Sequence, residues 1–83
     1  MNMDELRARI DALDKTVLEC LNERARYAQE IAQLKRSADA PFYVPEREKT
    51  VLEKLAKLNQ GPLSETAIRA IYREIMSAIR ALE

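Results

Sequence analysis

The feature that most constrains the fold is an uninterrupted helical pattern over residues 3–37, which contains neither Gly nor Pro. Asn2 is placed to cap its start, with Glu5 at the spacing of a capping box. A stripe of mostly apolar residues recurs every four and three positions, which is the heptad spacing of a packed helical seam. The stripe positions are Leu6, Ile10, Leu13, Val17, Cys20, Arg24, Tyr27, Ile31 and Leu34.

The length of this helix creates a packing problem. About 35 residues give a helix roughly 50 Å long. A compact chain of 83 residues has a radius of gyration of only about 12 Å, and therefore a diameter of about 30 Å. Because no Gly or Pro is available to bend the helix, we expect it to extend into a second copy. The sequence therefore predicts an intertwined homodimer, in which two long helices pair and the shorter helices wrap around both.

Two shorter helices are predicted over residues 45–59 and 65–83. Pro45 suits the first position of a helix, and Ser64 is placed as an N-cap. The run Asn-Gln-Gly-Pro at residues 59–62 is a strong stop signal between the two helices. The predicted fold is therefore all-α, with one long and two shorter helices in each chain.

The composition agrees with a single helical domain spanning residues 1–83. Apolar residues make up 47% and charged residues 34%, with one Gly and three Pro, a profile typical of long helices. The 14 basic and 14 acidic side chains cancel, which argues against binding to nucleic acid or to an anionic membrane surface. No stretch approaches the roughly 20 apolar residues that span a bilayer.

The chain has no His and a single cysteine, Cys20. The lack of His removes the usual general base and, with only one Cys, most transition-metal sites, so we expect no metal. An intrachain disulfide is impossible. Cys20 lies on the apolar stripe and is expected to be buried. The expected location is the cytoplasm.

Arg24 occupies a position of the stripe itself, where an unpaired buried charge would be very costly. Lys35 follows eleven residues later, which returns it to nearly the same face, about 16 Å along the helix axis. Ala28 and Ile31 lie between them, so the two cations could hold a small anion over an apolar floor. Arg7 lies about 25 Å from Arg24 along the same helix, too far to contact the same small ligand within one chain, although an antiparallel partner helix could bring it back.

Further charged residues flank the other two apolar faces. Arg47 and Glu48 stand one turn ahead of the stripe of the second helix, and Glu83 extends the face of the third. Each of these charges also has an ordinary interpretation. Arg24 could fix the register of a helical seam, Lys35 could favour a helix C-terminus, and the others could be solvated surface charges.

Several short motifs combine over essentially the whole chain. They are Leu6-Arg7, Ile10-Asp11-x-Leu13-Asp14, Leu21-Asn22-Glu23-Arg24, Ile31-Ala32-x-x-Lys35 and Pro45-Glu46-Arg47-Glu48. Their combined spacing resembles the all-helical class of chorismate mutase, and is most similar to the mutase domain found fused ahead of prephenate dehydratase. The resemblance implies a homodimer that converts chorismate to prephenate by a Claisen rearrangement, without a cofactor, in phenylalanine and tyrosine biosynthesis. It is also compatible with a downstream domain in a longer protein.

The resemblance implies a role for each cation. Arg24 and Arg7 of the partner subunit would pair with the two carboxylates of chorismate, preferably in the bidentate mode open to guanidinium groups. Arg47 would add positive charge near the same anion. Lys35 would donate a hydrogen bond to the ether oxygen, on which negative charge develops in the transition state.

The remaining positions include two departures from the family pattern. Glu48 would accept a hydrogen bond from the ring hydroxyl, and Glu83 stands where the family has Gln or Glu as a second donor to the ether oxygen. Val44 replaces an Asp that faces the ring hydroxyl in some members. Ile79 replaces a Ser near a substrate carboxylate in many members, so it offers only backbone groups or an apolar wall.

A non-catalytic helical dimerisation or regulatory module is the alternative interpretation. It accounts for the heptad pattern, the long helix and the single cysteine. It does not account for three arginines and a lysine that converge only in a dimer. Arg24 in the stripe, with Lys35 eleven residues later, favours the enzyme.

Overall fold

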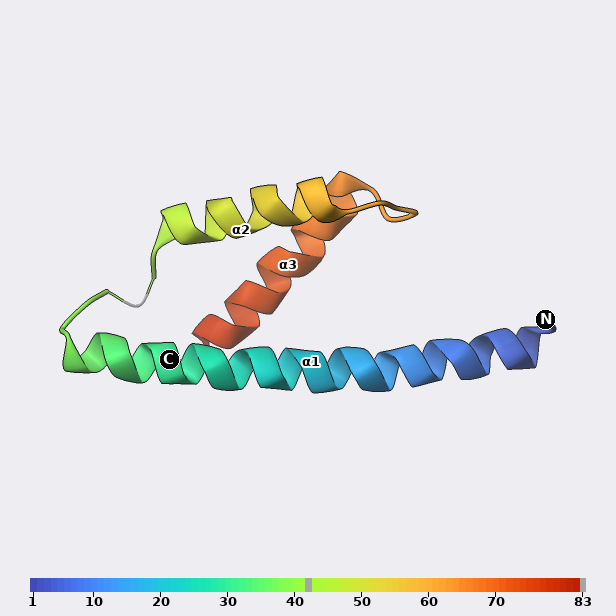
Figure 1. Ribbon diagram of the computed structural model, residues 1–83, viewed down its shortest axis with the longest axis horizontal. Helices are drawn as coiled ribbons and strands as arrows, with labels where there is room; N and C mark the ends of the chain where they lie inside the picture. Colours follow the sequence, from blue (N-terminus) through green and yellow to red (C-terminus); the bar gives the residue numbers. More distant parts are fainter. Residues whose placement is uncertain (42, 83) are drawn as a thin grey trace.

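The computed structural model describes residues 1–41 and 43–82. Three α-helices follow one another: α1 (Met3–Ser37), α2 (Pro45–Leu58) and α3 (Glu65–Arg80). The described residues contain no β-strand. In Figure 1, α2 and α3 form a hairpin above α1, and α3 runs obliquely from the far end of α2 back to α1. The predicted all-α fold, with one long and two shorter helices, is confirmed.

The start of α1 is fixed by the predicted cap. The side chain of Asn2 accepts a hydrogen bond from the backbone N–H of Glu5 over 2.8 Å. Its amide nitrogen donates to the Glu5 carboxylate over 3.0 Å. Acidic side chains occupy the first turn and basic ones the last, which is the arrangement that the helix dipole favours.

The start of each shorter helix also follows the sequence. Pro45 occupies the first turn of α2, where its missing N–H has no intrahelical partner to lose. The hydroxyl of Ser64 accepts from the backbone N–H of Ala67 over 3.1 Å at the start of α3. These local signals therefore place the helix starts correctly.

The ends of the two shorter helices come earlier than predicted. α2 ends at Leu58 because Asn59 turns into an extended conformation. The Asn59 amide donates to the carbonyl of Leu63 over 2.7 Å and accepts from the N–H of Gly61 over 3.0 Å. The α3 helix ends at Arg80 rather than at residue 83. Beyond Arg80 the backbone hydrogen bonding changes to three-residue spacing, because the Leu82 N–H donates to the carbonyl of Ile79.

The chain is elongated, measuring 54 × 23 × 17 Å. Its radius of gyration of 15.8 Å exceeds the value of about 12 Å expected for a compact domain of this length. α3 contacts both α2 and α1, and the N-terminal part of α1 projects beyond the hairpin (Figure 1). Among the described residues, Ala32, Leu52 and Met76 are the buried hydrophobic ones.

The apolar stripe of α1 is exposed along much of its length in the single chain. Leu6, Ile10 and Leu13 are 46%, 56% and 63% exposed, and Ile31 is 52% exposed. Cys20 is exposed as well, so its predicted burial is not found within one chain. The physical reason is that α2 and α3 leave this side of α1 uncovered. No helix among the described residues is long and apolar enough to cross a membrane.

The caps provide a direct test of how local signals stabilise this fold. Ser64→Ala removes the acceptor for the Ala67 N–H, and we expect it to lower the free energy of unfolding by about 1 kcal/mol. Ser37→Ala is the control, because the Ser37 hydroxyl only donates to the carbonyl of Gln33 within α1; it should change stability by less than about 0.5 kcal/mol. Urea unfolding at one fixed protein concentration measures both. Equal losses would contradict the capping role.

Candidate active site

A cationic hollow of about 310 Å³ lies where the three helices meet. Its walls come from the C-terminal half of α1, the start of α2 and the end of α3. The lining residues are Arg24, Ala28, Ile31, Lys35, Val44, Arg47, Glu48, Val51, Met76, Ile79 and Arg80. Helices distant in the sequence therefore bring charged and apolar side chains to one place.

The α1 wall has the predicted composition. Arg24 and Lys35 are both partly buried and lie three turns apart. Ala28 and Ile31 line the hollow between them. The two cations thus lie along one apolar floor, as their spacing in the sequence predicts.

The first turn of α2 contributes a cation and a carboxylate. Val44 is the N-cap residue, and its carbonyl accepts from the N–H groups of Arg47 and Glu48 over 3.1 and 3.3 Å. This turn therefore fixes the backbone that carries both side chains. Glu48 is partly buried, whereas Arg47 is exposed in the single chain.

The α3 wall contains a charged residue that the sequence analysis missed. Met76 is buried and Ile79 is partly buried, and both line the hollow. Arg80 joins them and forms an ion pair with Glu48. Its guanidinium carbon also lies 4.7 Å from the centre of the Tyr43 ring. The available signal was the position of Arg80 one turn beyond Met76, on the apolar face of the helix.

Among the described residues, six of the predicted site residues line this hollow and one, Arg7, does not. The residues that meet are Arg24, Lys35, Val44, Arg47, Glu48 and Ile79. Arg7 does not line it, because it lies nearly five helical turns from Arg24 along α1. Glu83 lies outside the described residues.

The charge balance of the hollow favours an anionic ligand. Among its described lining residues, four cations (Arg24, Lys35, Arg47 and Arg80) face one carboxylate. Cationic groups beside apolar walls act on a ligand more strongly than they would in bulk water. The described residues include no group of three or more His, Cys, Asp or Glu side chains that could hold a metal ion.

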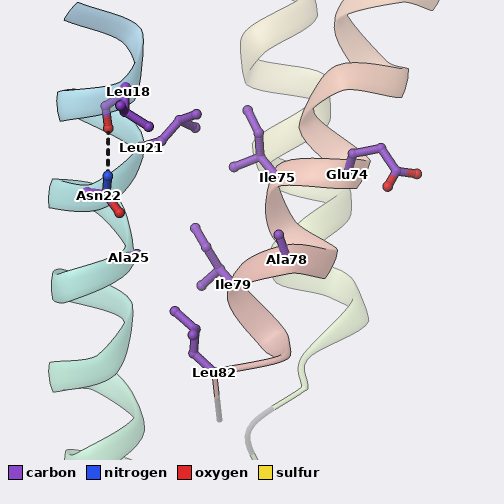
Figure 2. A pocket seen from close by; sticks show the side chains of 9 residues that line it. All are labelled: Leu18, Leu21, Asn22, Ala25, Glu74, Ile75, Ala78, Ile79 and Leu82. Carbon is purple, nitrogen blue, oxygen red and sulfur yellow. Dashed lines mark hydrogen bonds between the residues drawn. The ribbon is translucent and has the colours of Figure 1, made fainter. Parts of the chain in front are cut away.

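A second hollow, of about 420 Å³, separates α1 from α3 and has a different character. Figure 2 shows Leu18 and Leu21 of α1 facing Ile75 of α3 across it. Asn22 donates to the carbonyl of Leu18 over 3.1 Å in its own helix. Its described lining residues include no cation, so none of them can neutralise an anion. The cationic hollow is therefore the better candidate for a ligand site.

The fold and the cationic hollow match one family of enzymes. Residues 6–83 match the chorismate mutase type II family, and this chain belongs to that family. It is 47% identical over 94% of its length to a bifunctional chorismate mutase/prephenate dehydratase from Stutzerimonas stutzeri. It is 44% identical over 98% of its length to the corresponding protein from Aquifex aeolicus. The chain spans about a quarter of each of these relatives (23% and 24%).

Two solved structures of chorismate mutases have the same fold as this chain. A chorismate mutase from Thermus thermophilus superposes with a TM-score of 0.95 at 35% identity, covering 96% of this chain and 91% of that one. A chorismate mutase from Helicobacter pylori in complex with prephenate superposes with a TM-score of 0.88 at 32% identity, covering 95% and 86%. The matched region therefore makes up most of each of these two solved chains.

Proposed function

We propose that this chain is an isomerase that converts chorismate to prephenate, and that the cationic hollow is its active site. The observation that carries the proposal is the excess of positive charge among the described lining residues, four cations against one carboxylate. Chorismate is a dianion with two carboxylates, an ether oxygen and a ring hydroxyl. Membership of the chorismate mutase family and the printed names of the relatives support the same reaction.

The reaction needs positioning and charge stabilisation rather than acid–base chemistry. The ether C–O bond breaks while a new C–C bond forms within the same molecule, so no proton or group enters or leaves. Holding the folded conformer lowers the entropic part of the barrier. Hydrogen-bond donors that face the ether oxygen stabilise its growing negative charge. A chain without His is suited to this chemistry.

Four of the charged residues that line the hollow receive a role in the proposal. Arg24 binds a carboxylate, and Arg47 adds positive charge beside the dianion. Lys35 donates to the ether oxygen from the opposite end of the α1 floor. Glu48 accepts from the ring hydroxyl. The support is their convergence on one hollow and the chemistry of each group.

Three further positions complete the proposed site. Val44 and Ile79 line the hollow as apolar walls, so the ring-hydroxyl contact depends on Glu48. Glu83 is proposed as a second donor to the ether oxygen, a role that requires its protonated form because an ionised carboxylate only accepts hydrogen bonds.

We also propose that the active unit is a homodimer. The exposed stripe of α1 supports this, because Leu6, Ile10 and Leu13 are about half exposed in the single chain. Burying apolar surface between two chains stabilises their association by about 25 cal/mol per Å². An antiparallel second α1 on this stripe could carry Arg7 of the partner subunit toward Arg24. The relatives' names further support a dehydratase region beyond this segment in a longer protein.

The function is tested by chorismate consumption, followed by loss of absorbance. We expect activity in the parent chain. Arg24→Lys keeps the charge but loses the planar fork, and should lower kcat/KM at least about tenfold. Arg26→Lys is the control, because Arg26 is exposed on α1 and does not line the hollow; it should keep parental kinetics. An inactive parent chain would contradict the proposed function, and parental kinetics in Arg24→Lys would contradict the carboxylate role.

The dimer is tested by sedimentation of the unmodified protein. At micromolar concentration we expect a mass of twice the 9.5 kDa of one chain, because the α1 stripe would otherwise face water. Leu13→Glu places a charge on that stripe and should shift the equilibrium toward monomer. A fully helical monomer of the parent chain at the same concentration would contradict the intertwined assembly.

The sharing of sites between subunits has its own test. Arg7→Ala and Arg24→Ala chains should each be nearly inactive as homodimers. In a mixed dimer, one site carries both substitutions and the other carries neither, so we expect mixing to restore activity. The assay is chorismate turnover after joint unfolding and refolding. Heterodimers that form without any rescue would argue against Arg7 acting across the dimer.

A further inference from the structure

The Glu48–Arg80 ion pair joins two helices at the wall of the cationic hollow. Glu48 belongs to the first turn of α2 and Arg80 to the last turn of α3, 32 residues apart in the sequence. The pair is partly buried, with 25% of the Glu48 side chain and 36% of the Arg80 side chain exposed. Both residues also line a separate groove between α2 and α3. The ion pair therefore forms part of the partition between the two spaces.

Arg80 makes two kinds of contact that a planar guanidinium can combine. Its Nη1 atom donates to Oε2 of Glu48. The same group lies over the Tyr43 ring, with 4.7 Å between the guanidinium carbon and the ring centre. A lysine ammonium would keep the charge but lacks the planar guanidinium group that makes both contacts. Arg80 thus links the end of α3 to the start of α2 and to the segment before it.

Building on the proposed function, we propose that Arg80 is a positioning residue for the mutase reaction, which holds the Glu48 carboxylate against the wall of the active site. Arg80 occupies Oε2, and within the described residues Oε1 of Glu48 makes no hydrogen bond. A carboxylate accepts several hydrogen bonds, so Oε1 can serve the ring hydroxyl while Oε2 stays paired.

The charge of Glu48 explains why such a residue is needed. An uncompensated carboxylate in the hollow would repel a dianionic substrate. It could also turn toward Arg24, Lys35 or Arg47, which line the same hollow, and neutralise the cations that the substrate requires. Pairing with Arg80 on the α3 side compensates the charge of the carboxylate, so that it repels the substrate less. The same pairing keeps the carboxylate from turning toward the other cations. Removing one partner of such a pair leaves the other charge uncompensated.

The expected consequence is weaker substrate binding. Arg80→Gln removes the charge and should raise KM for chorismate at least about fivefold, with a smaller change in kcat, because the repulsion acts on the bound substrate and on the transition state alike. Arg80→Lys keeps the charge without the planar guanidinium group and should give a KM between those of the parent and Arg80→Gln.

A double-substitution cycle tests whether Arg80 acts through Glu48. In a Glu48→Gln background the carboxylate is already absent, so adding Arg80→Gln should change KM by less than about twofold. Arg69→Gln is the matched control, because it breaks the 3.0 Å Arg69–Glu65 ion pair of α3 outside the cationic hollow. This control should keep the parental KM. Helicity and the urea midpoint of every variant establish that it is folded.

The outcomes separate this inference from the proposed function. A parent chain that does not consume chorismate would overturn the proposed function, and this inference with it. An active parent in which Arg80→Gln raises KM equally with and without the Glu48 carboxylate would overturn the inference alone. An unchanged KM in Arg80→Gln would also overturn it. If Arg80→Gln does not fold, Arg80→Lys carries the same cycle, with an unchanged KM again contradicting the positioning role.

Discussion

The length of α1 is the constraint on which the rest of the structure depends. A straight helix of 35 residues is longer than a compact domain of this size, so a hairpin of two shorter helices cannot cover it. The chain consequently extends to 54 Å and leaves the apolar stripe of α1 exposed. The same helix provides the rigid floor that carries Arg24 and Lys35. One element therefore creates both the surface available for assembly and the base of the proposed active site.

The α2–α3 hairpin turns this floor into a binding site. Local signals fix where each shorter helix begins: Pro45 for α2 and Ser64 for α3. Packing of α3 against both other helices then brings the start of α2 and the end of α3 over the same part of α1.

The two hollows show how charge separates a ligand site from a packing surface. The space between α1 and α3 is lined almost entirely by apolar side chains (Figure 2), which offer a dianion no compensation for its lost hydration. The cationic hollow offers four basic groups against one carboxylate among its described lining residues. Within it, the Arg80 pair gives the carboxylate a partner that leaves the other cations available to the substrate.

The sequence alone determined the three helices, their starting caps and the alignment of Arg24 with Lys35, because these follow from hydrogen bonds and periodicity within a few turns. It also placed Arg47 and Glu48 beside the apolar face of the second helix. Only the tertiary structure decided that Arg80 meets Glu48, since the two are 32 residues apart and their contact depends on how α3 crosses α2. The position of Arg7 relative to the hollow likewise depends on packing between helices, which periodicity within one helix does not encode.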